Sequence, residues 1–295
     1  MTIQNQDALP TELDKLFERS ILDLGIPSCP IILNRFMIEI RKDEPDYVRL
    51  ESIIESDVSL AGGLIKTANA PYFGLRKRAR SVKEALIMLG LKTSSQAIAG
   101  IILHNSFPSV HNLDRFWDAS ARIARLSSWL AQRLKIQGLG QDDAYTYGLF
   151  RDCGIPVLLG HFKNYPTILN TANHEEKLSF TEIEEIELPT NHAMVGCILA
   201  QSWWLPEEIF LAIRNHHSLA ALESTDLPIP LLSRRLIAIS QLAELIIQQQ
   251  LDLSQTREWS KLGAACLKYL NLVEGQLDEL FTEASQIVAD MEQKN

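Results

Sequence analysis

Arg151 and Asp152, in the segment 149–154 (LFRDCG), are the residues of this chain best placed to do chemistry. A His-Asp doublet near the end of an apolar helix would direct an imidazole nitrogen and a carboxylate oxygen at one cation, which is the basis of divalent-metal phosphohydrolase chemistry. Arginine stands where that histidine would be. A guanidinium has no lone pair to donate and stays protonated, so Arg151 cannot bind a metal and its charge opposes one nearby. Asp152 is the single ligand that this motif retains.

Three histidines later in the chain, His192, His216 and His217, are the other residue types that a metal site would need. They could converge on Asp152 if the helices that carry them pack together. In one interpretation they keep a residual cation or phosphate site. In the other they are hydrogen-bonded residues of the core or its rim, as buried histidines commonly are. We favour the second interpretation, and we expect no metal and no cofactor.

The elements that carry these residues are predicted to be helices. Almost every segment shows apolar residues at three- and four-residue spacing, and none shows the sustained alternation of a strand bounded by hairpin turns. Ser81 with Glu84, and Ser179 with Glu182, have the spacing of a capping box. Gly90 is expected to end the helix that Ser81 opens. The sequence therefore predicts an all-α protein, with an N-terminal helical bundle packed on a C-terminal helical bundle.

The predicted organisation has three parts along the 295 residues. Residues 1–25 form a leading helix, and residues 26–222 form the main domain. This domain divides into an N-terminal helical bundle, 26–110, and a second half, 111–222. The segment 223–295 adds further helices, which we expect to pack on the second half.

Composition excludes several classes of protein. The net charge of −9 and the pI near 5.3 argue against broad binding to nucleic acid or to anionic membranes. The four cysteines form no CxxC pair, so neither a disulfide framework nor a structural zinc cluster is indicated. We expect no signal peptide and no membrane-spanning segment. We expect a cytoplasmic protein.

A basic segment interrupts this acidic composition. Arg76, Lys77, Arg78 and Arg80 lie close together just before the helix that Ser81 opens. They could contact an anion or a partner, or they could be an ordinary solvated loop. Because the chain is acidic and shows no helix-turn-helix pattern, nucleic acid is not the expected ligand. A docking surface for an acidic protein partner fits better.

With these residues laid out, the chain resembles the HDOD family, bacterial proteins named as HD-related output domains. The resemblance runs from about Ile26 to about Leu222. It depends on the order and spacing of several short motifs, namely Pro27, Pro30, IIESDVSLAGGLIKTANAPYFGL, Ser81-Val82, Ala85-Leu86, Leu89-Gly90-Leu91, Phe116-Trp117, Leu149 to Gly154, His192, Val195-Gly196, Trp204-Leu205-Pro206 and Ile213 to His217.

The resemblance implies an HD-like second half whose metal site is degenerate. The family resembles HD phosphohydrolases, but its members generally lack catalytic ligands and act as regulatory or protein-binding modules. By this resemblance the first metal histidine corresponds to Ala119, the histidine of the doublet to Arg151, and the late aspartate to Glu244. Asp152, His192, His216 and His217 would be the retained positions. The Gly-Tyr-Pro signature of phosphodiesterase relatives is absent after His217, where the sequence reads SLAALESTDLPIP.

Arg151 offers a way to keep the fold without the chemistry. Neighbouring helical residues point about 100° apart, so Arg151 and Asp152 need not pair. Arg151 could instead reach Glu244 or an acidic ligand and replace the charge of a metal with its own.

We therefore expect a non-enzymatic signal-transduction module that binds a protein partner through this scaffold. The alternative is a metal-dependent phosphohydrolase that uses Asp152, His192, His216 and His217. Nucleotide binding in the cleft is left open and has no support in the sequence.

Overall fold

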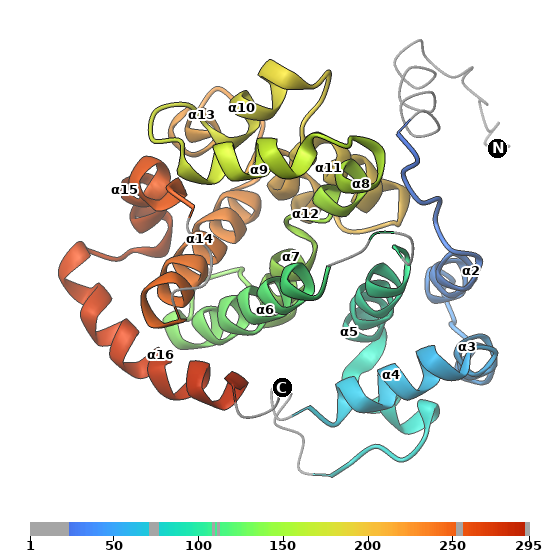
Figure 1. The fold of residues 1–295 in the computed structure, drawn as a ribbon. Coiled ribbons are helices and arrows are strands. Elements are labelled where there is room, and N and C mark those ends of the chain that lie inside the picture. Colours follow the sequence, from blue (N-terminus) through green and yellow to red (C-terminus); the bar gives the residue numbers. More distant parts are fainter. Residues whose placement is uncertain (1–23, 71–76, 108–109, 111–112, 252–255, 293–295) are drawn as a thin grey trace, which may run out of the picture.

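The computed structural model describes residues 24–70, 77–107, 110, 113–251 and 256–292. Within these residues every regular element is a helix, so the prediction of an all-α protein is confirmed for this part of the chain (Figure 1). The leading helix predicted within residues 1–25 lies outside the described residues, apart from Leu24 and Gly25, and stays a prediction.

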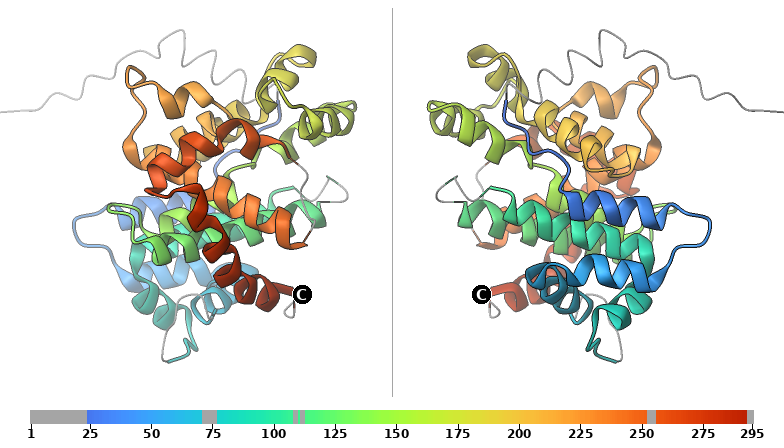
Figure 2. Two further views of the ribbon diagram at one scale, coloured as in Figure 1. Left: turned by 90° about the vertical axis from the view of Figure 1, so that its left-hand side faces the viewer. Right: turned by 90° about the vertical axis from the view of Figure 1, so that its right-hand side faces the viewer.

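The first helices pack together against one long helix. They are α2 (Ile31–Ile40), α3 (Tyr47–Glu55), α4 (Val58–Ala68) and α5 (Val82–Asn105). The carboxylate of Asp46 accepts hydrogen bonds from the first backbone N–H groups of α3, and that of Asp57 does the same for α4. Each of α2, α3 and α4 contacts α5, and they lie alongside it in Figure 2. Leu33, Leu50 and Leu64 are fully buried there.

Helix α5 begins and bends where the sequence predicts. The Ser81 side chain accepts a hydrogen bond from the N–H of Glu84, while the Glu84 carboxylate binds the N–H of Arg80 rather than that of Ser81. Gly90 has φ +75°, a left-handed conformation that favours glycine, so the helix is interrupted there. By length and composition α5 could cross a membrane. Its two pieces, 82–89 and 91–105, are each shorter than the roughly 20 residues that a crossing needs.

The middle of the chain supplies eight helices, several of which line the candidate site. Two glycines allow close packing around α7. A Cβ at Gly148 would lie 2.8 Å from the Cα of Ala124 on α6, and one at Gly100 on α5 would meet the Leu149 side chain. The eight are α6 (Asp114–Leu134), α7 (Gln141–Phe150), α8 (Gly154–His161), α9 (Tyr165–His174), α10 (Phe180–Glu187), α11 (His192–Ser202), α12 (Glu207–Asn215) and α13 (Leu219–Glu223).

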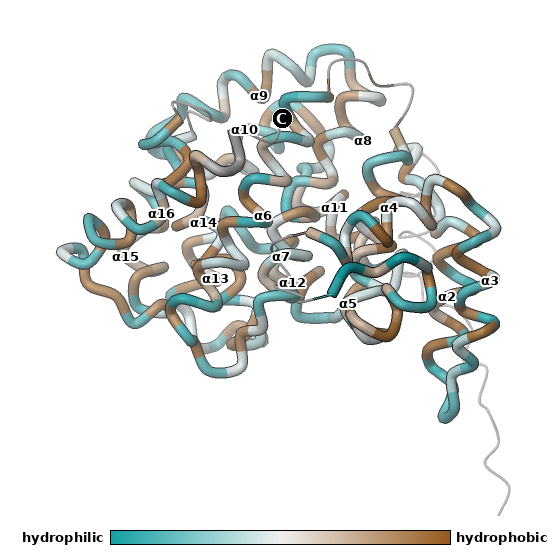
Figure 3. The backbone as a smooth tube through the Cα atoms, turned by 90° about the horizontal axis from the view of Figure 1, so that it is seen from below, coloured by the Kyte–Doolittle hydropathy of each residue, from teal (hydrophilic) through white to brown (hydrophobic). Residues whose placement is uncertain are grey.

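The last helices are α14 (Leu231–Leu251), α15 (Glu258–Leu270), the short 3-10 helix η2 (Glu274–Gln276) and α16 (Leu277–Glu292). Helix α14 contacts α6, α7, α12, α15 and α16, and most of its side chains are buried. Hydrophobic and hydrophilic residues alternate along these helices, as Figure 3 shows. The buried residues of α14 and α15 belong to the same hydrophobic core as those of the earlier helices.

Candidate functional site

Asp152 is brought to His192 by a close approach between α8 and α11. A Cβ on Gly154, the first residue of α8, would lie 2.1 Å from the backbone oxygen of His192. The Sγ of Cys153 lies 3.6 Å from the oxygen of Gly196. The turn 151–153 packs against the start of α11. The polar side-chain groups of this turn and of that helix therefore lie in one buried space.

The three predicted histidines and Asp152 do converge. The Nε2 atom of His192 lies 3.1 Å from that of His216 and 3.2 Å from that of His217. Oδ1 of Asp152 lies 3.2 Å from Nε2 of His216 and 3.7 Å from Nε2 of His192. The four donor atoms all lie within 4.8 Å of one another. His192 and His216 are fully buried, and Asp152 is 18% exposed.

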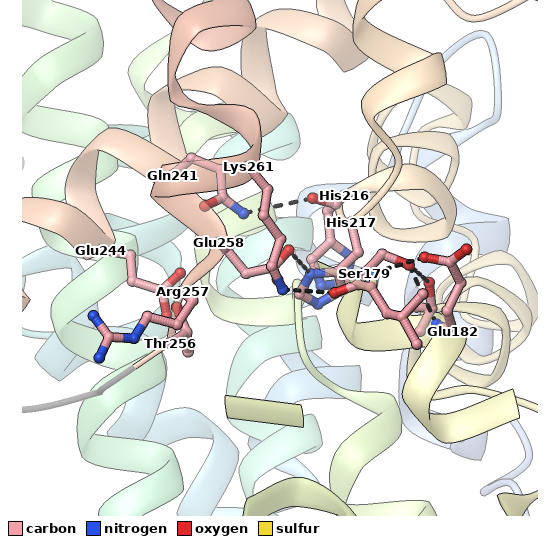
Figure 4. Close-up of polar contacts among 12 residues, drawn as sticks. Ser179, Glu182, His216, His217, Gln241, Glu244, Thr256, Arg257, Glu258 and Lys261 are labelled. Atoms are coloured by element: carbon pink, nitrogen blue, oxygen red, sulfur yellow. Dashed lines mark hydrogen bonds and ion pairs between the residues drawn. The ribbon is translucent and has the colours of Figure 1, made fainter. Parts of the chain in front are cut away.

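Each histidine is held by a partner at its other ring nitrogen. Nδ1 of His192 lies 2.7 Å from Oε2 of Glu184, and Nδ1 of His216 lies 2.7 Å from the backbone oxygen of Ile213. Nδ1 of His217 lies 2.5 Å from Oε2 of Glu258. Figure 4 shows Glu258 reaching His217 from α15. Such outer partners fix the orientation of imidazoles that bind metals.

The neighbouring charges set different pKa values for the three imidazoles. Burial opposes protonation of His192, but the Glu184 carboxylate outweighs it and raises the pKa of His192. Burial lowers the pKa of His216, although Asp152 partly opposes this. Burial, together with the two other histidines, holds the pKa of His217 well below its ordinary value. This direction of the shift favours the neutral form of His217.

Arg151 pairs with two carboxylates. Its Nη2 lies 3.0 Å from Oδ2 of Asp152 and 3.1 Å from Oε1 of Glu244. The pairing with Glu244 is the arrangement that the sequence suggested. Arg151 also pairs with Asp152, although adjacent residues need not pair. The pairing is possible because α7 ends at Phe150 and both charged groups lie in one cleft. Burial opposes charge on both groups, yet the pairing raises the pKa of Arg151 and holds that of Asp152 well below its usual range.

A cleft of about 480 Å³ opens beside this cluster. Ala119 lines it and offers no ligand atom, as the sequence indicated. Arg122 also lines it and is tied to Asp118 through a 2.7 Å contact between Nε and Oδ2. All but one of the seven predicted site positions border this cleft; His216 is buried behind it. The six are Ala119, Arg151, Asp152, His192, His217 and Glu244.

The donor set fits one cation and does not fit a second. Ligands about 2.1 Å from a tetrahedral metal lie about 3.4 Å from one another, and four distances in the cluster lie between 3.1 and 3.7 Å. His192, His216, His217 and Asp152 would hold that ion. A second ion beside Asp152 and Glu244 would meet the guanidinium of Arg151. The expectation that the protein holds no metal stays a prediction.

Sequence reasoning missed the outer partners of the histidines. Glu184 lies in an acidic helix whose neighbours Glu182, Glu185 and Glu187 are exposed, yet it is fully buried. Its carboxylate also accepts the hydroxyl of Tyr165 and the backbone N–H of His192. The only available signal was the helical period, which places Glu184 beside the apolar Phe180 and Ile183.

No sequence pattern pointed to Glu258 as a partner of His217. Glu258 begins a helix of the C-terminal tail, far from His217 in the sequence. Lys261, one turn later, lies 2.9 Å from its Oε1.

The remaining predicted residues fall outside the cluster. Lys77, Arg78 and Arg80 are exposed, whereas Arg76 lies outside the described residues. Cys153, next to Asp152, is buried, and burial raises the pKa of its thiol well above the ordinary value, which disfavours the reactive thiolate. Of the two adjacent tryptophans, Trp203 is buried. Trp204 is 43% exposed beneath the guanidinium of Arg41.

Fold and site together define an all-α protein of HD-related type with a buried histidine and aspartate cluster. The profile of the HDOD domain matches residues 26–219, and the chain belongs to this family. An uncharacterized protein of Treponema pallidum (strain Nichols) is 27% identical over 225 residues, which cover 74% of this chain and 43% of that protein. The chain thus matches less than half the length of this relative.

Solved structures show the same fold at low identity. An HDOD domain protein of unknown function from Geobacter sulfurreducens has a TM-score of 0.64 and 21% identity, covering 95% of this chain and 96% of that chain. A candidate signal transduction protein from Marinobacter aquaeolei VT8 has a TM-score of 0.66 and 19% identity, with coverage of 96% and 64%. A candidate phosphohydrolase from Shewanella amazonensis SB2B has a TM-score of 0.63 and 16% identity, with coverage of 91% and 93%.

Proposed function

We propose that this protein is a non-catalytic signal-transduction module that acts by binding a protein partner. One observation carries the proposal. The guanidinium of Arg151 lies between Asp152 and Glu244, where a phosphohydrolase doublet would help to hold a metal. Ala119, which also lines the cleft, adds no ligand. Such a site lacks the paired metal ions that clamp the attacking and leaving oxygens of a phosphoester.

The basic segment before α5 supports the partner-binding part of the proposal. Lys77, Arg78 and Arg80 are exposed. The segment is pinned at Ala79, whose N–H and C=O both bind the side chain of Asn69 at 2.8 Å. A fixed group of cations on a chain of net charge −9 fits an acidic protein surface. We infer a cytoplasmic setting from the free, largely buried cysteines of the described residues.

The test of this function is a hydrolysis assay on the purified full chain. The protein is supplied in turn with Mn²⁺, Fe²⁺ and Zn²⁺, and is offered phosphomonoesters, phosphodiesters and cyclic dinucleotides. We expect no turnover above that of the Asp152→Ala variant. Turnover that depends on Asp152 would refute the non-catalytic proposal. In a separate arm, the K77E/R78E/R80E variant is expected to lose binding to an acidic model protein in low salt.

A second candidate function is a metal-dependent phosphohydrolase with an atypical ligand set. The observation that favours it is the convergence of three Nε2 atoms and Asp152 Oδ1 within 4.8 Å. A cation held there would polarise a phosphoryl oxygen and lower the pKa of a bound water. The protein's own contribution would be to orient the three imidazoles and to offer the adjoining cleft. The same assay separates the two candidates, because only this one predicts turnover.

A further inference from the structure

The contacts of the three imidazoles decide which ring nitrogen carries the proton. Nδ1 of His216 faces a backbone oxygen, and Nδ1 of His192 and of His217 each face a carboxylate. Carbonyl and carboxylate oxygens are acceptors, so each Nδ1 must be the donor. In a neutral ring the other nitrogen, Nε2, then carries a lone pair.

When all three rings are neutral, their three Nε2 lone pairs point at one another. Nε2 of His192 faces the Nε2 atoms of both other histidines at 3.1 and 3.2 Å, and Oδ1 of Asp152 adds a fourth acceptor 3.2 Å from His216. Acceptors at such distances repel unless a cation lies among them, and a single proton between two of them would leave the rest unsatisfied. A metal ion would therefore satisfy these acceptors better than a single hydrogen bond would.

The carboxylate on His217 comes from a distant part of the chain. Glu258 is the first residue of α15, whereas the family profile ends at residue 219. It is 1% exposed and is fixed on both sides, by His217 Nδ1 at 2.5 Å and by Lys261 Nζ at 2.9 Å. Lys261 also binds the backbone oxygen of Leu178, just before α10, which carries Glu184. Lys261 thus links the carboxylate of Glu258 to the segment that precedes the helix of Glu184.

We propose that Glu184 and Glu258 are positioning residues that lock His192 and His217 with Nε2 toward one divalent cation, so that α15 is part of a cation site. The proposal rests on the cation site of the second candidate function and is independent of hydrolysis. Removing an outer carboxylate of this kind typically weakens metal binding by about 10–100-fold. The same loss is not expected from a carboxylate that only stabilises the fold.

The test is a titration of the full-length metal-free protein with Co²⁺, followed by its visible absorption, with Zn²⁺ as the competitor. The wild-type protein should bind one equivalent, and Asp152→Ala should bind none. Glu184→Gln and Glu258→Gln should each weaken binding about 10–100-fold and alter the absorption spectrum. Glu187→Gln, which removes an exposed carboxylate from the same helix as Glu184, is the matched control and should leave both unchanged.

A second measurement protects the test against a variant that does not fold. Nitrogen NMR of the metal-free wild-type protein should show His217 as the neutral ring with its proton on Nδ1. A proton on Nε2 of His217 would overturn the proposed role of Glu258. Metal binding of equal strength in wild type, E184Q and E258Q would also overturn the proposal, while leaving a cation site. Absence of any binding by the wild type would remove the cation site itself, and would leave the non-catalytic proposal intact.

Discussion

The Nη2 atom of Arg151 lies 3.1 Å from Oε1 of Glu244, and both side chains are almost fully buried. The two residues come from the end of α7 and from the middle of α14. Their ion pair therefore joins a helix of the family domain to one that lies beyond it. The fixed positive charge of Arg151 at this point partly offsets the negative charges of Glu244 and Asp152.

Loss of the Arg151 charge should destabilise the protein. Arg151→Leu leaves two buried carboxylates without their cation, and breaking such a buried pair costs about 3–5 kcal/mol. Arg151→Leu combined with Glu244→Leu should lose less, because only Asp152 is then left without its cation. Denaturant unfolding measures both. Equal losses in the single and double variants would show that the pair is unimportant.

Restoring the histidine of the doublet should not create a hydrolase. Arg151→His supplies an imidazole beside Asp152, yet Ala119, which lines the same cleft, still has no ligand atom. We expect no phosphodiesterase activity from this variant with any of the three metals. The proposal of a non-catalytic site would not survive measurable turnover by Arg151→His.

The contact between α8 and α11 should tolerate no side chain at Gly154. A Cβ there would meet the His192 oxygen at 2.1 Å, so Gly154→Ala must displace backbone and should cost about 1–3 kcal/mol or more. The control is Gly62→Ala in α4, where a Cβ meets nothing within 4 Å. That variant should gain about 0.5–1 kcal/mol, since alanine is the better helix former. A neutral Gly154→Ala would show that the two helices are not in such close contact.

Acid should weaken the corner between α2 and α3. A hydrogen bond from Lys42 lowers the pKa of Glu39, and the N–H of Asp46 and the charge of Arg49 act in the same direction. A carboxyl whose pKa is lower in the folded state stabilises the fold above its unfolded pKa. That contribution is lost as the pH falls through the folded value. The difference in unfolding free energy between wild type and Glu39→Gln should therefore be largest near neutral pH and shrink below about pH 4.3. A constant difference would contradict this.

The helices could be predicted from the sequence because helical periodicity is a local pattern. Four site residues could be predicted from their type, namely Asp152, His192, His216 and His217. The helical period predicted the all-α class, and Ser81 and Gly90 marked the start and the interruption of α5. Asp152 and His192 could be singled out as residue types that bind metals. Their convergence was one of two open interpretations.

The partners of the histidines could not be predicted in the same way. Glu258 reaches His217 only because α15 folds back on the domain, and no local pattern encodes that contact. Glu184 lies among exposed acidic residues and reads as part of a solvated face. Whether a carboxylate is a surface charge or a partner of a buried imidazole is decided by packing between distant segments.

The number of metal ions per chain tests the central claim most directly. Purified protein is saturated with Mn²⁺ or Zn²⁺, freed of unbound metal by gel filtration, and measured by elemental analysis beside Asp152→Ala. Because Arg151 holds the place of one cation, we predict at most one equivalent, and none in the variant. Two equivalents in the wild-type protein, both lost in Asp152→Ala, would contradict the account.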